Sequence, residues 1–378
     1  MIIISSKPKD QTQKTKDQHP KTFMNFYPLT IKDIRKETAT CVSISFHIPT
    51  EIKEEFAYNA GQYITLKTKI NDEEIRRSYS LCSSPLENDF RIAVKQVDGG
   101  LFSSFANNNL KIGDSLDIAA PNGKFGTIHS ANNTKKYVAI AAGSGITPVL
   151  SIIKTALIAE PTSEFILVYG NKNTGSIIFK EEIEALKNKF VGRLQLIHIL
   201  SREKTDAPIS SGRIDAEKLQ QLSKLINWKN CNEFFICGPE EMTVTAKYFL
   251  EKQDIDKKQI HFELFTTAAK TKNKPFVPQV KSETKSKITI KSDGRTFEVE
   301  IGFNEDKTIL DAALQNGADL PFACKGGVCC TCKAKLLEGQ VEMDVNWGLE
   351  HEEIEQGFIL TCQSHPLTER VLIDYDVK

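Results

Sequence analysis

The chain has 378 residues, of which 40% are hydrophobic and 26% charged, and its formal net charge is zero. This composition is typical of a folded protein with two or three domains, and without a basic excess nucleic acid is not expected as a partner. No apolar run is long enough for a signal peptide or a membrane span, so we expect a cytoplasmic protein that does not bind membranes.

The first third of the chain changes from a polar segment to a strand-like one. Residues 1–23 are Lys-rich and have no apolar period, which predicts a disordered extension before Met24. Across 24–130 apolar and polar residues alternate, as in the run VSISF at 42–46. Short strands of this period, separated by Gly, Asn and Pro, predict an antiparallel β-barrel.

The pattern changes again between 131 and 265. Candidate strands (YVAIAA, FILVYG, LQLIHIL, EFFICG and IHFELF) alternate with helical stretches such as FKEEIEALKNKF. This alternation predicts a doubly wound parallel α/β domain. Residues 266–286 have no apolar period and contain two prolines, so we expect a semi-extended linker there.

Residues 287–378 predict a third domain, which makes the expected fold class multidomain α+β. The stretch KITIKSDGRTFEVEI has the pattern of a β-hairpin, and TILDAALQNG that of one short helix. These elements predict a β-grasp-like domain.

The cysteine spacing carries the strongest chemical signal. Cys324, Cys329, Cys332 and Cys362 follow the C-x4-C-x2-C…C pattern of plant-type [2Fe–2S] ferredoxins, in which four thiolates hold two irons. Buried free thiols and a zinc site are the alternatives, although paired C-x2-C knuckles are absent from the sequence. Cys330 breaks the ligand spacing and is either a small buried side chain, a swapped ligand or a redox sensor.

A flavin site is indicated by the segment RSYS at 77–80, which resembles the R-x-Y-S/T motif of the ferredoxin-NADP reductase superfamily. The resemblance implies Arg77 on the flavin pyrophosphate, with Ser78 beside it, Tyr79 against the isoalloxazine or ribityl, and Ser80 near flavin N5. A guanidinium is a bidentate phosphate clamp, although an arginine here is also compatible with a plain surface residue. Further positions similar to the superfamily's flavin contacts are Val94, Lys95, Gly100, Phe102, Ser103 and Ser104.

The glycine-containing segment AGSGITP at 142–148 comes directly after the YVAIA strand and before a predicted helix. Glycines there let a pyrophosphate approach the helix N-terminus, although a simple tight turn is the alternative. Ser201 and Arg202 end the LQLIHIL strand and suit a 2′-phosphate, which favours NADPH over NADH, whereas Glu203 argues against it. The loop residues expected to contact the nucleotide are Gly143, Ser144, Gly145, Thr147 and Pro148.

The segment CGPEEM at 237–242 resembles the superfamily's C-G-P-x-x-M turn. The resemblance implies that Cys237 packs beside the nicotinamide at hydride transfer, with Gly238 and Met242 shaping the turn. Glu263 is similar to the acidic residue near the reacting rings, which adds it to Ser80 and Cys237 as a candidate for catalysis. A core thiol and a surface carboxylate at a strand end are the plainer interpretations.

These sites together predict an electron-transfer enzyme, because a hydride donor and a one-electron cluster need a flavin between them. Long stretches, among them ILDAALQNGADLPFACKGGVC and LTCQSHPLTERVLIDYDVK, resemble the reductase subunits of bacterial phenylacetyl-CoA epoxidase systems. This resemblance implies FAD, NADPH and a di-iron multicomponent oxygenase as electron acceptor.

Three alternatives stay open at this point. One is an FMN-containing reductase component of an aromatic-ring dioxygenase, which shares the domain order. Another is a stand-alone reductase of a small acceptor, and the third a redox sensor or scaffold without catalysis. The sequence leaves the oligomeric state undecided and is compatible with a monomer.

Overall fold

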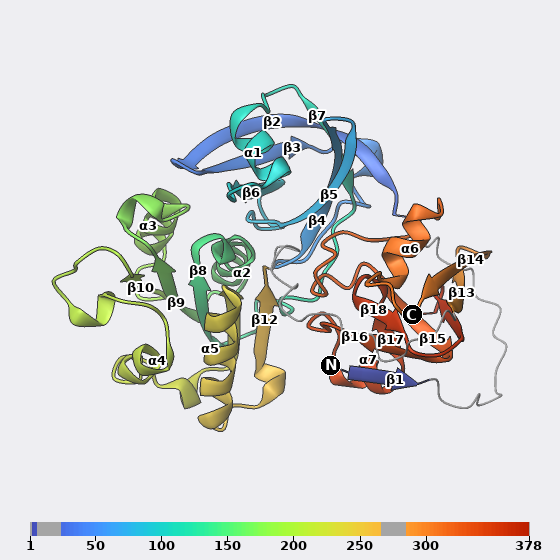
Figure 1. Ribbon diagram of the computed structural model, residues 1–378. Helices are drawn as coiled ribbons and strands as arrows, with labels where there is room; N and C mark the ends of the chain where they lie inside the picture. Colours follow the sequence, from blue (N-terminus) through green and yellow to red (C-terminus); the bar gives the residue numbers. More distant parts are fainter. Residues whose placement is uncertain (1, 6–23, 266–284, 378) are drawn as a thin grey trace. The chain divides into compact units, whose positions relative to one another are not determined.

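The computed structural model describes residues 2–5, 24–265 and 285–377 (Figure 1). They divide into two compact units, of which one spans Phe26–Phe265 and the other joins the N-terminal strand to the C-terminal part of the chain. Most of the predicted linker and of the predicted N-terminal extension lies outside the described residues.

The expected antiparallel barrel is formed by six strands in the order β5-β4-β7-β2-β3-β6. A bridge between Leu81 and Ile92 links the two ends of this sheet. The predicted alternation is borne out, because Val42, Ile44 and Phe46 enter the barrel core. The elements are β2 (Phe26–Thr38), β3 (Cys41–His47), β4 (Tyr63–Ile70), β5 (Glu73–Ser80), β6 (Arg91–Lys95), α1 (Leu101–Asn108) and β7 (Ser115–Ala119).

The α/β part is a parallel sheet of order β10-β9-β8-β11-β12. Strands are added on one side of β8 up to β10 and on its other side from β11 onward, so the strand order reverses at β8. Ligands of doubly wound sheets bind at the carboxyl ends of the strands beside such a switch point. All five predicted strands are present. The elements are β8 (Lys136–Ala142), α2 (Ile146–Ala159), β9 (Glu164–Asn171), α3 (Lys180–Lys189), β10 (Leu194–Leu200), α4 (Ala216–Leu222), β11 (Glu233–Gly238), α5 (Glu240–Lys252) and β12 (Ile260–Leu264).

Buried hydrogen bonds join the barrel to α2 within this unit. Ser84 Oγ and Thr155 Oγ1 lie 2.8 Å apart, and Ser151 Oγ donates to the Ser83 carbonyl oxygen at 2.6 Å. Buried polar groups that satisfy one another fix a single relative placement, because breaking them leaves unpaired donors in the interior. The barrel and the sheet therefore meet in a defined arrangement.

The C-terminal unit contains a mixed sheet, β14-β13-β19-β15-β17, and a three-stranded sheet, β1-β16-β18. The latter corrects the sequence prediction, because Ile2–Ser5 form β1 on β16 and are not disordered. β13 begins at Lys285, inside the predicted linker. The elements are β1 (Ile2–Ser5), β13 (Lys285–Ser292), β14 (Arg295–Gly302), α6 (Ile309–Gln315), β15 (Lys333–Glu338), β16 (Gln340–Met343), α7 (His351–Glu355), β17 (Phe358–Leu360), β18 (Ser364–Pro366) and β19 (Arg370–Asp374).

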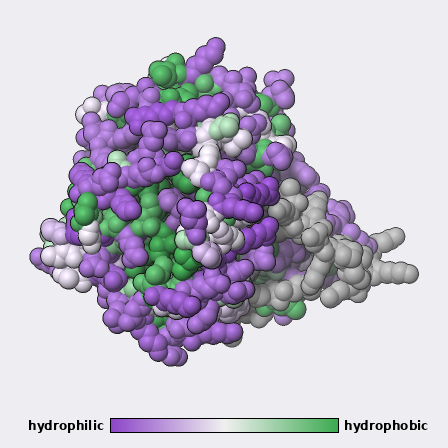
Figure 2. Space-filling view, turned by 90° about the vertical axis from the view of Figure 1, so that its left-hand side faces the viewer, coloured by the Kyte–Doolittle hydropathy of each residue, from purple (hydrophilic) through white to green (hydrophobic). Residues whose placement is uncertain are grey.

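The surface is mixed in polarity. Figure 2 shows a face on which hydrophilic residues predominate and apolar ones gather in a band near the middle. Across the described ranges, every helix is too short or too polar to cross a bilayer.

Candidate flavin, nucleotide and cluster sites

Three residues expected to take part in catalysis come together in the structure. Cys237 and Glu263 are register partners on the adjacent parallel strands β11 and β12. Ser80, the last residue of β5, donates from Oγ to Glu263 Oε2 at 3.4 Å. The barrel and the α/β sheet thus each contribute to one polar centre, as expected where a flavin meets a nicotinamide.

Burial controls the protonation of this centre. Desolvation raises the pKa of Glu263 to about 8, against which the hydrogen bond from Ser80 works only partly. Burial, followed by the nearby Glu263 charge, also raises the pKa of the Cys237 thiol well above its usual value. At neutral pH the site therefore holds a protonated carboxyl and a neutral thiol, which place no negative charge beside an approaching hydride donor.

The RSYS segment lies on β5 as the motif requires. The Arg77 side chain is exposed, and the Tyr79 ring lies 5.5 Å from that of Phe102 with a tilt of 39°. Burial raises the pKa of Tyr79, so its hydroxyl stays neutral. Ser78 is held within the sheet through Thr65, with their hydroxyl oxygens 3.3 Å apart. A flat ring beside an exposed guanidinium suits an aromatic ring system attached to a phosphate.

The glycine segment after β6 forms the start of a helix. Gly100 is the N-cap of α1 and has no side chain to accept from the first-turn N–H groups, which suits an anion. Ser103 Oγ donates to the Gly100 carbonyl oxygen and accepts from the Val97 N–H, so it shapes the turn. Val94 is fully buried, and its side chain packs in the barrel core.

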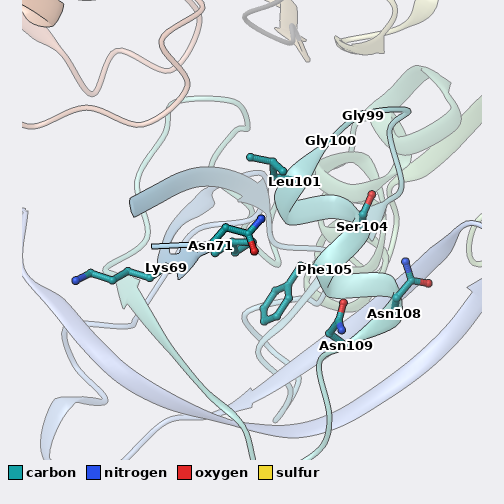
Figure 3. A pocket seen from close by; sticks show the side chains of 10 residues that line it. Lys69, Asn71, Gly99, Gly100, Leu101, Ser104, Phe105, Asn108 and Asn109 are labelled. Carbon is teal, nitrogen blue, oxygen red and sulfur yellow. The ribbon is translucent and has the colours of Figure 1, made fainter. Parts of the chain in front are cut away.

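A pocket of about 570 Å³ opens between α1 and the β4–β5 turn (Figure 3). Leu101, Ser104 and Phe105 line one side, and Lys69 and Asn71 the other. Amide and apolar groups therefore surround a space that begins at the helix N-terminus. Of the predicted flavin contacts, Gly100 and Ser104 line this pocket. The opposite wall is not indicated by any sequence motif, because the two walls are far apart in the chain.

Lys95 lies at the nucleotide loop. A Cβ added to Gly143 would stand 3.2 Å from Lys95 Nζ. Gly143 opens the turn η2 (Gly143–Gly145) before α2, and Tyr169 donates to its carbonyl oxygen at 3.0 Å. Burial, followed by the charge of Lys172, lowers the pKa of Lys95. Within the described parts of the chain Lys95 forms no ion pair, so it can bind an anion at this turn.

The nucleotide loop packs closely against β11. A Cβ at Gly145 would meet the Cys237 carbonyl oxygen at 2.1 Å, so a larger residue would push α2 from the strand. Thr147 donates to the Ser144 carbonyl oxygen at 3.0 Å, and Thr147 and Pro148 are buried. The hydrogen bond and the packing of these two residues stabilise the turn. Met242 lies over Gly238, as the C-G-P-x-x-M turn predicts.

The residues expected to choose the nucleotide lie together after β9 and β10. Ser201 Oγ donates to the Asn171 carbonyl oxygen at 3.3 Å, and the Arg202 side chain is exposed. The Glu203 carboxylate accepts from the Thr174 N–H and hydroxyl, both at 2.7 Å. These hydrogen bonds lower the pKa of Glu203 and hold it on Thr174. Its carboxylate is therefore already engaged in hydrogen bonds within the protein.

The four predicted cluster ligands meet as two pairs of thiols. Cys329 donates to Cys324, which lowers the pKa of Cys324 to about 6, and Cys332 donates to Cys362. In the described ranges no three His, Cys, Asp or Glu side chains converge as one metal ion would require. Two thiol pairs suit a cluster of two irons better than a single tetrahedral zinc.

The ligand loop is built for close approach of its backbone. Gly327 has a φ of +74°, and a Cβ there would press on Gln363 and Val345. Gly326 N–H donates to Cys324 Sγ at 3.2 Å, as expected of a loop that aims amides at cluster sulfur. The Cys330 thiol instead donates to the Gly348 carbonyl oxygen, and the residue is only partly buried against the core of this unit.

Comparison with protein families gives the same order of domains. Residues 28–126 match the oxidoreductase FAD-binding domain, 139–247 the oxidoreductase NAD-binding domain, and 290–367 the 2Fe-2S iron-sulfur cluster binding domain. The flavin and cluster predicted from the motifs are thereby confirmed as FAD and a 2Fe-2S centre.

Solved structures support the fold. Phthalate dioxygenase reductase matches 92% of this chain and 98% of its own, with a TM-score of 0.58 and 22% identity. The FAD/NAD-binding domain of nitric oxide dioxygenase from Vibrio cholerae covers 63% of this chain and 98% of its own, with a TM-score of 0.54 and 26% identity.

Two curated relatives extend over nearly the whole chain. A component of the 1,2-phenylacetyl-CoA epoxidase of Escherichia coli is 44% identical over 93% of this chain and 98% of its own length. The ferredoxin reductase component of 3-ketosteroid-9-alpha-monooxygenase from Rhodococcus rhodochrous is 33% identical over 92% and 96%. The chain therefore belongs to the family of these oxygenase reductase components, NAD(P)H-dependent oxidoreductases with an FAD domain, an NAD domain and a 2Fe-2S domain in one polypeptide.

Proposed function

We propose that this reductase takes electrons from NADPH and delivers them to the di-iron oxygenase component of a phenylacetyl-CoA epoxidase. The observation that carries the proposal is the 44% identity to the Escherichia coli epoxidase component along almost the full length of both chains. When bound, FAD would supply the conversion from two-electron to one-electron transfer that such an oxygenase needs. We place this activity in the cytoplasm.

Reconstitution tests the acceptor directly. Purified chain, mixed with the oxygenase subunits of a phenylacetyl-CoA epoxidase, should support NADPH-dependent epoxidation of phenylacetyl-CoA. The ketosteroid and glycine betaine oxygenases, whose reductases are also relatives, serve as competing acceptors. Faster electron delivery to either of them would contradict the proposed partner and leave the reductase chemistry intact.

The proposed ligand sets follow the geometry described above, with domain limits at 24–130, 131–265 and 287–378. Arg77, Tyr79 and the start of α1 would hold the flavin, whose reacting edge would lie near Ser80. Lys95 and the η2 turn would hold the pyrophosphate of the nicotinamide nucleotide. Cys324, Cys329, Cys332 and Cys362 would bind the two irons.

Preference for NADPH rests on Arg202 and on the engaged carboxylate of Glu203. Removing a charge-assisted hydrogen bond to a phosphate costs about 1.5–3 kcal/mol, or about 10- to 150-fold in affinity. We therefore expect Arg202→Ala to raise the KM for NADPH by that factor and to leave the KM for NADH unchanged, as measured by ferricyanide reduction. Arg213→Ala, at another exposed arginine, is the matched control. Equal losses with both nucleotides would contradict a 2′-phosphate contact.

We propose that the pocket of Figure 3 holds the adenosine end of FAD, because it begins where α1 can hold the pyrophosphate. Asn108→Trp fills it with an indole and should weaken FAD binding to the apoprotein about 10-fold, the scale of one stacked base. FMN lacks adenosine, so its affinity should stay the same. Fluorescence titrations with both flavins measure this. Lys111→Trp, on the exposed surface nearby, controls for the added ring, and equal weakening of both flavins would rule the pocket out.

A further inference from the structure

The distant ligand Cys362 lies in the short helix η8 (Thr361–Gln363), between two buried polar neighbours. Thr361 reaches the cluster loop on one side, where its Oγ1 donates to the Cys332 carbonyl oxygen at 3.1 Å. Its backbone N–H donates to the same oxygen at 3.2 Å. Thr361, which precedes the fourth ligand Cys362, is thus hydrogen-bonded to the third ligand, Cys332.

Gln363 reaches the other end of the loop. Its Nε2 donates to the Lys325 carbonyl oxygen at 2.9 Å, directly after the first ligand Cys324. The same Nε2 donates to the Cys362 carbonyl oxygen at 2.9 Å and lies 3.8 Å from Cys362 Sγ. Two carbonyl acceptors leave only one orientation for the amide, with nitrogen toward the loop.

The packing around Gln363 leaves little freedom. The residue is 5% exposed, and a Cβ on Gly327 would stand 3.0 Å from its Cγ. Its backbone oxygen accepts from Asp344 N–H at 3.0 Å. Within the described residues, its Oε1 is buried without a hydrogen-bond partner. Burying an unpaired amide oxygen is unfavourable, so this position needs the donor end of the side chain and not merely its volume.

We propose that Gln363 is a positioning residue for the [2Fe–2S] cluster. Its amide ties Cys362 to the loop at Lys325 and so fixes the fourth thiolate relative to the first. Together with Thr361, on the other side of Cys362 in the sequence, it secures the distant ligand at both ends of the loop. The proposal rests on the assignment of the four cysteines as cluster ligands. Groups that hold metal ligands in place tune both the affinity and the electronic properties of a metal site.

Gln363→Met tests the role of the amide, because methionine keeps the length and apolar stem but donates no hydrogen bond. We expect a loss of acid-labile sulfide about 10-fold faster under chelator, the lower bound for disrupted outer contacts. The EPR g-values of the reduced cluster should change, and its midpoint potential should become more negative. NADPH-dependent ferricyanide reduction, which needs only the flavin, should stay at the wild-type rate.

Gln340→Met is the matched control, since Gln340 is exposed on β16 of the same unit. If Gln363→Met does not accumulate, Gln363→Glu keeps the shape and replaces the donor by a carboxylate, with the same expected changes. Wild-type g-values, potential and sulfide retention in the Gln363 variant would overturn the proposal, as would identical changes in Gln340→Met. A wild-type protein without acid-labile sulfide would instead refute the cluster assignment itself.

Discussion

Cys329→Ser should abolish electron flow from NADPH to cytochrome c while ferricyanide reduction continues. The hydroxyl of serine stays protonated at neutral pH and is a poor ligand for iron, so one of the two thiol pairs no longer holds its metal. The flavin and nucleotide sites belong to the other compact unit and should keep their activity. Acid-labile sulfide and the two steady-state rates, measured on the same preparation, check the result.

The neighbouring Cys330 provides the control. Its thiol binds the Gly348 carbonyl oxygen, so Cys330→Ser should retain the cluster, its visible spectrum and the rate of cytochrome c reduction. Loss of sulfide in Cys330→Ser together with its retention in Cys329→Ser would show that the ligand spacing is shifted by one residue. Loss of ferricyanide reduction in Cys329→Ser would mean that the variant damages more than the cluster.

Glu263→Ala should slow reduction of the flavin by NADPH by about 100-fold, the lower bound for a positioned acid–base group. The carboxyl is protonated below a pKa of about 8 and contacts Ser80, the residue expected near flavin N5. Ionisation would place a negative charge beside a ring that is gaining electrons. The wild-type rate should therefore fall as the pH rises through about 8, in stopped-flow measurements that follow the visible absorbance of the oxidised flavin.

Glu263→Gln separates charge from shape. The amide is neutral at every pH, so the decline above a pH of about 8 should disappear. The pH dependence of the free energy of unfolding gives an independent test. The pKa of Glu263 in the folded protein lies above its ordinary value of 4.5, so the unfolded chain ionises first as the pH rises. The folded state therefore loses stability between pH 4.5 and about 8. Glu263→Gln should therefore melt above the wild type at a pH of about 8 and not at a pH of about 4. A pH profile unchanged by the substitution would assign the titration to another group.

Much of the fold was predictable because its signals are local. Parallel strands such as YVAIAA at 137–142 are nearly continuous apolar runs. The hairpin at the start of the C-terminal unit has its turn at Asp293 and Gly294, both with positive φ. Cysteine spacing is equally local, because three of the four ligands come from one loop. These features depend on residues that are neighbours in sequence, where periodicity and motif spacing carry information.

What could not be predicted depends on contacts between distant segments. The direction of Lys95 follows from how the barrel meets β8 and η2, and nothing in the surrounding sequence indicates it. The helix α1 begins at Leu101, directly after Gly99 and Gly100, where the sequence predicts no helix. In the sequence Gln363 has no feature that distinguishes it from other polar residues. Its role follows from the position of η8, which lets its side-chain amide donate to the Lys325 carbonyl oxygen. Side-chain partners of this kind are set by tertiary packing.

The short strand β1 has a practical consequence for dissecting the protein. A fragment that starts at Lys285 would contain all four predicted cluster ligands and both neighbours of Cys362. It would nevertheless leave the outer edge of β16 with unsatisfied N–H and C=O groups, where Ile4 is normally buried. Open edges of this kind recruit strands from other molecules. An isolated ferredoxin fragment should therefore self-associate, and adding a peptide with the sequence IIIS should suppress that association.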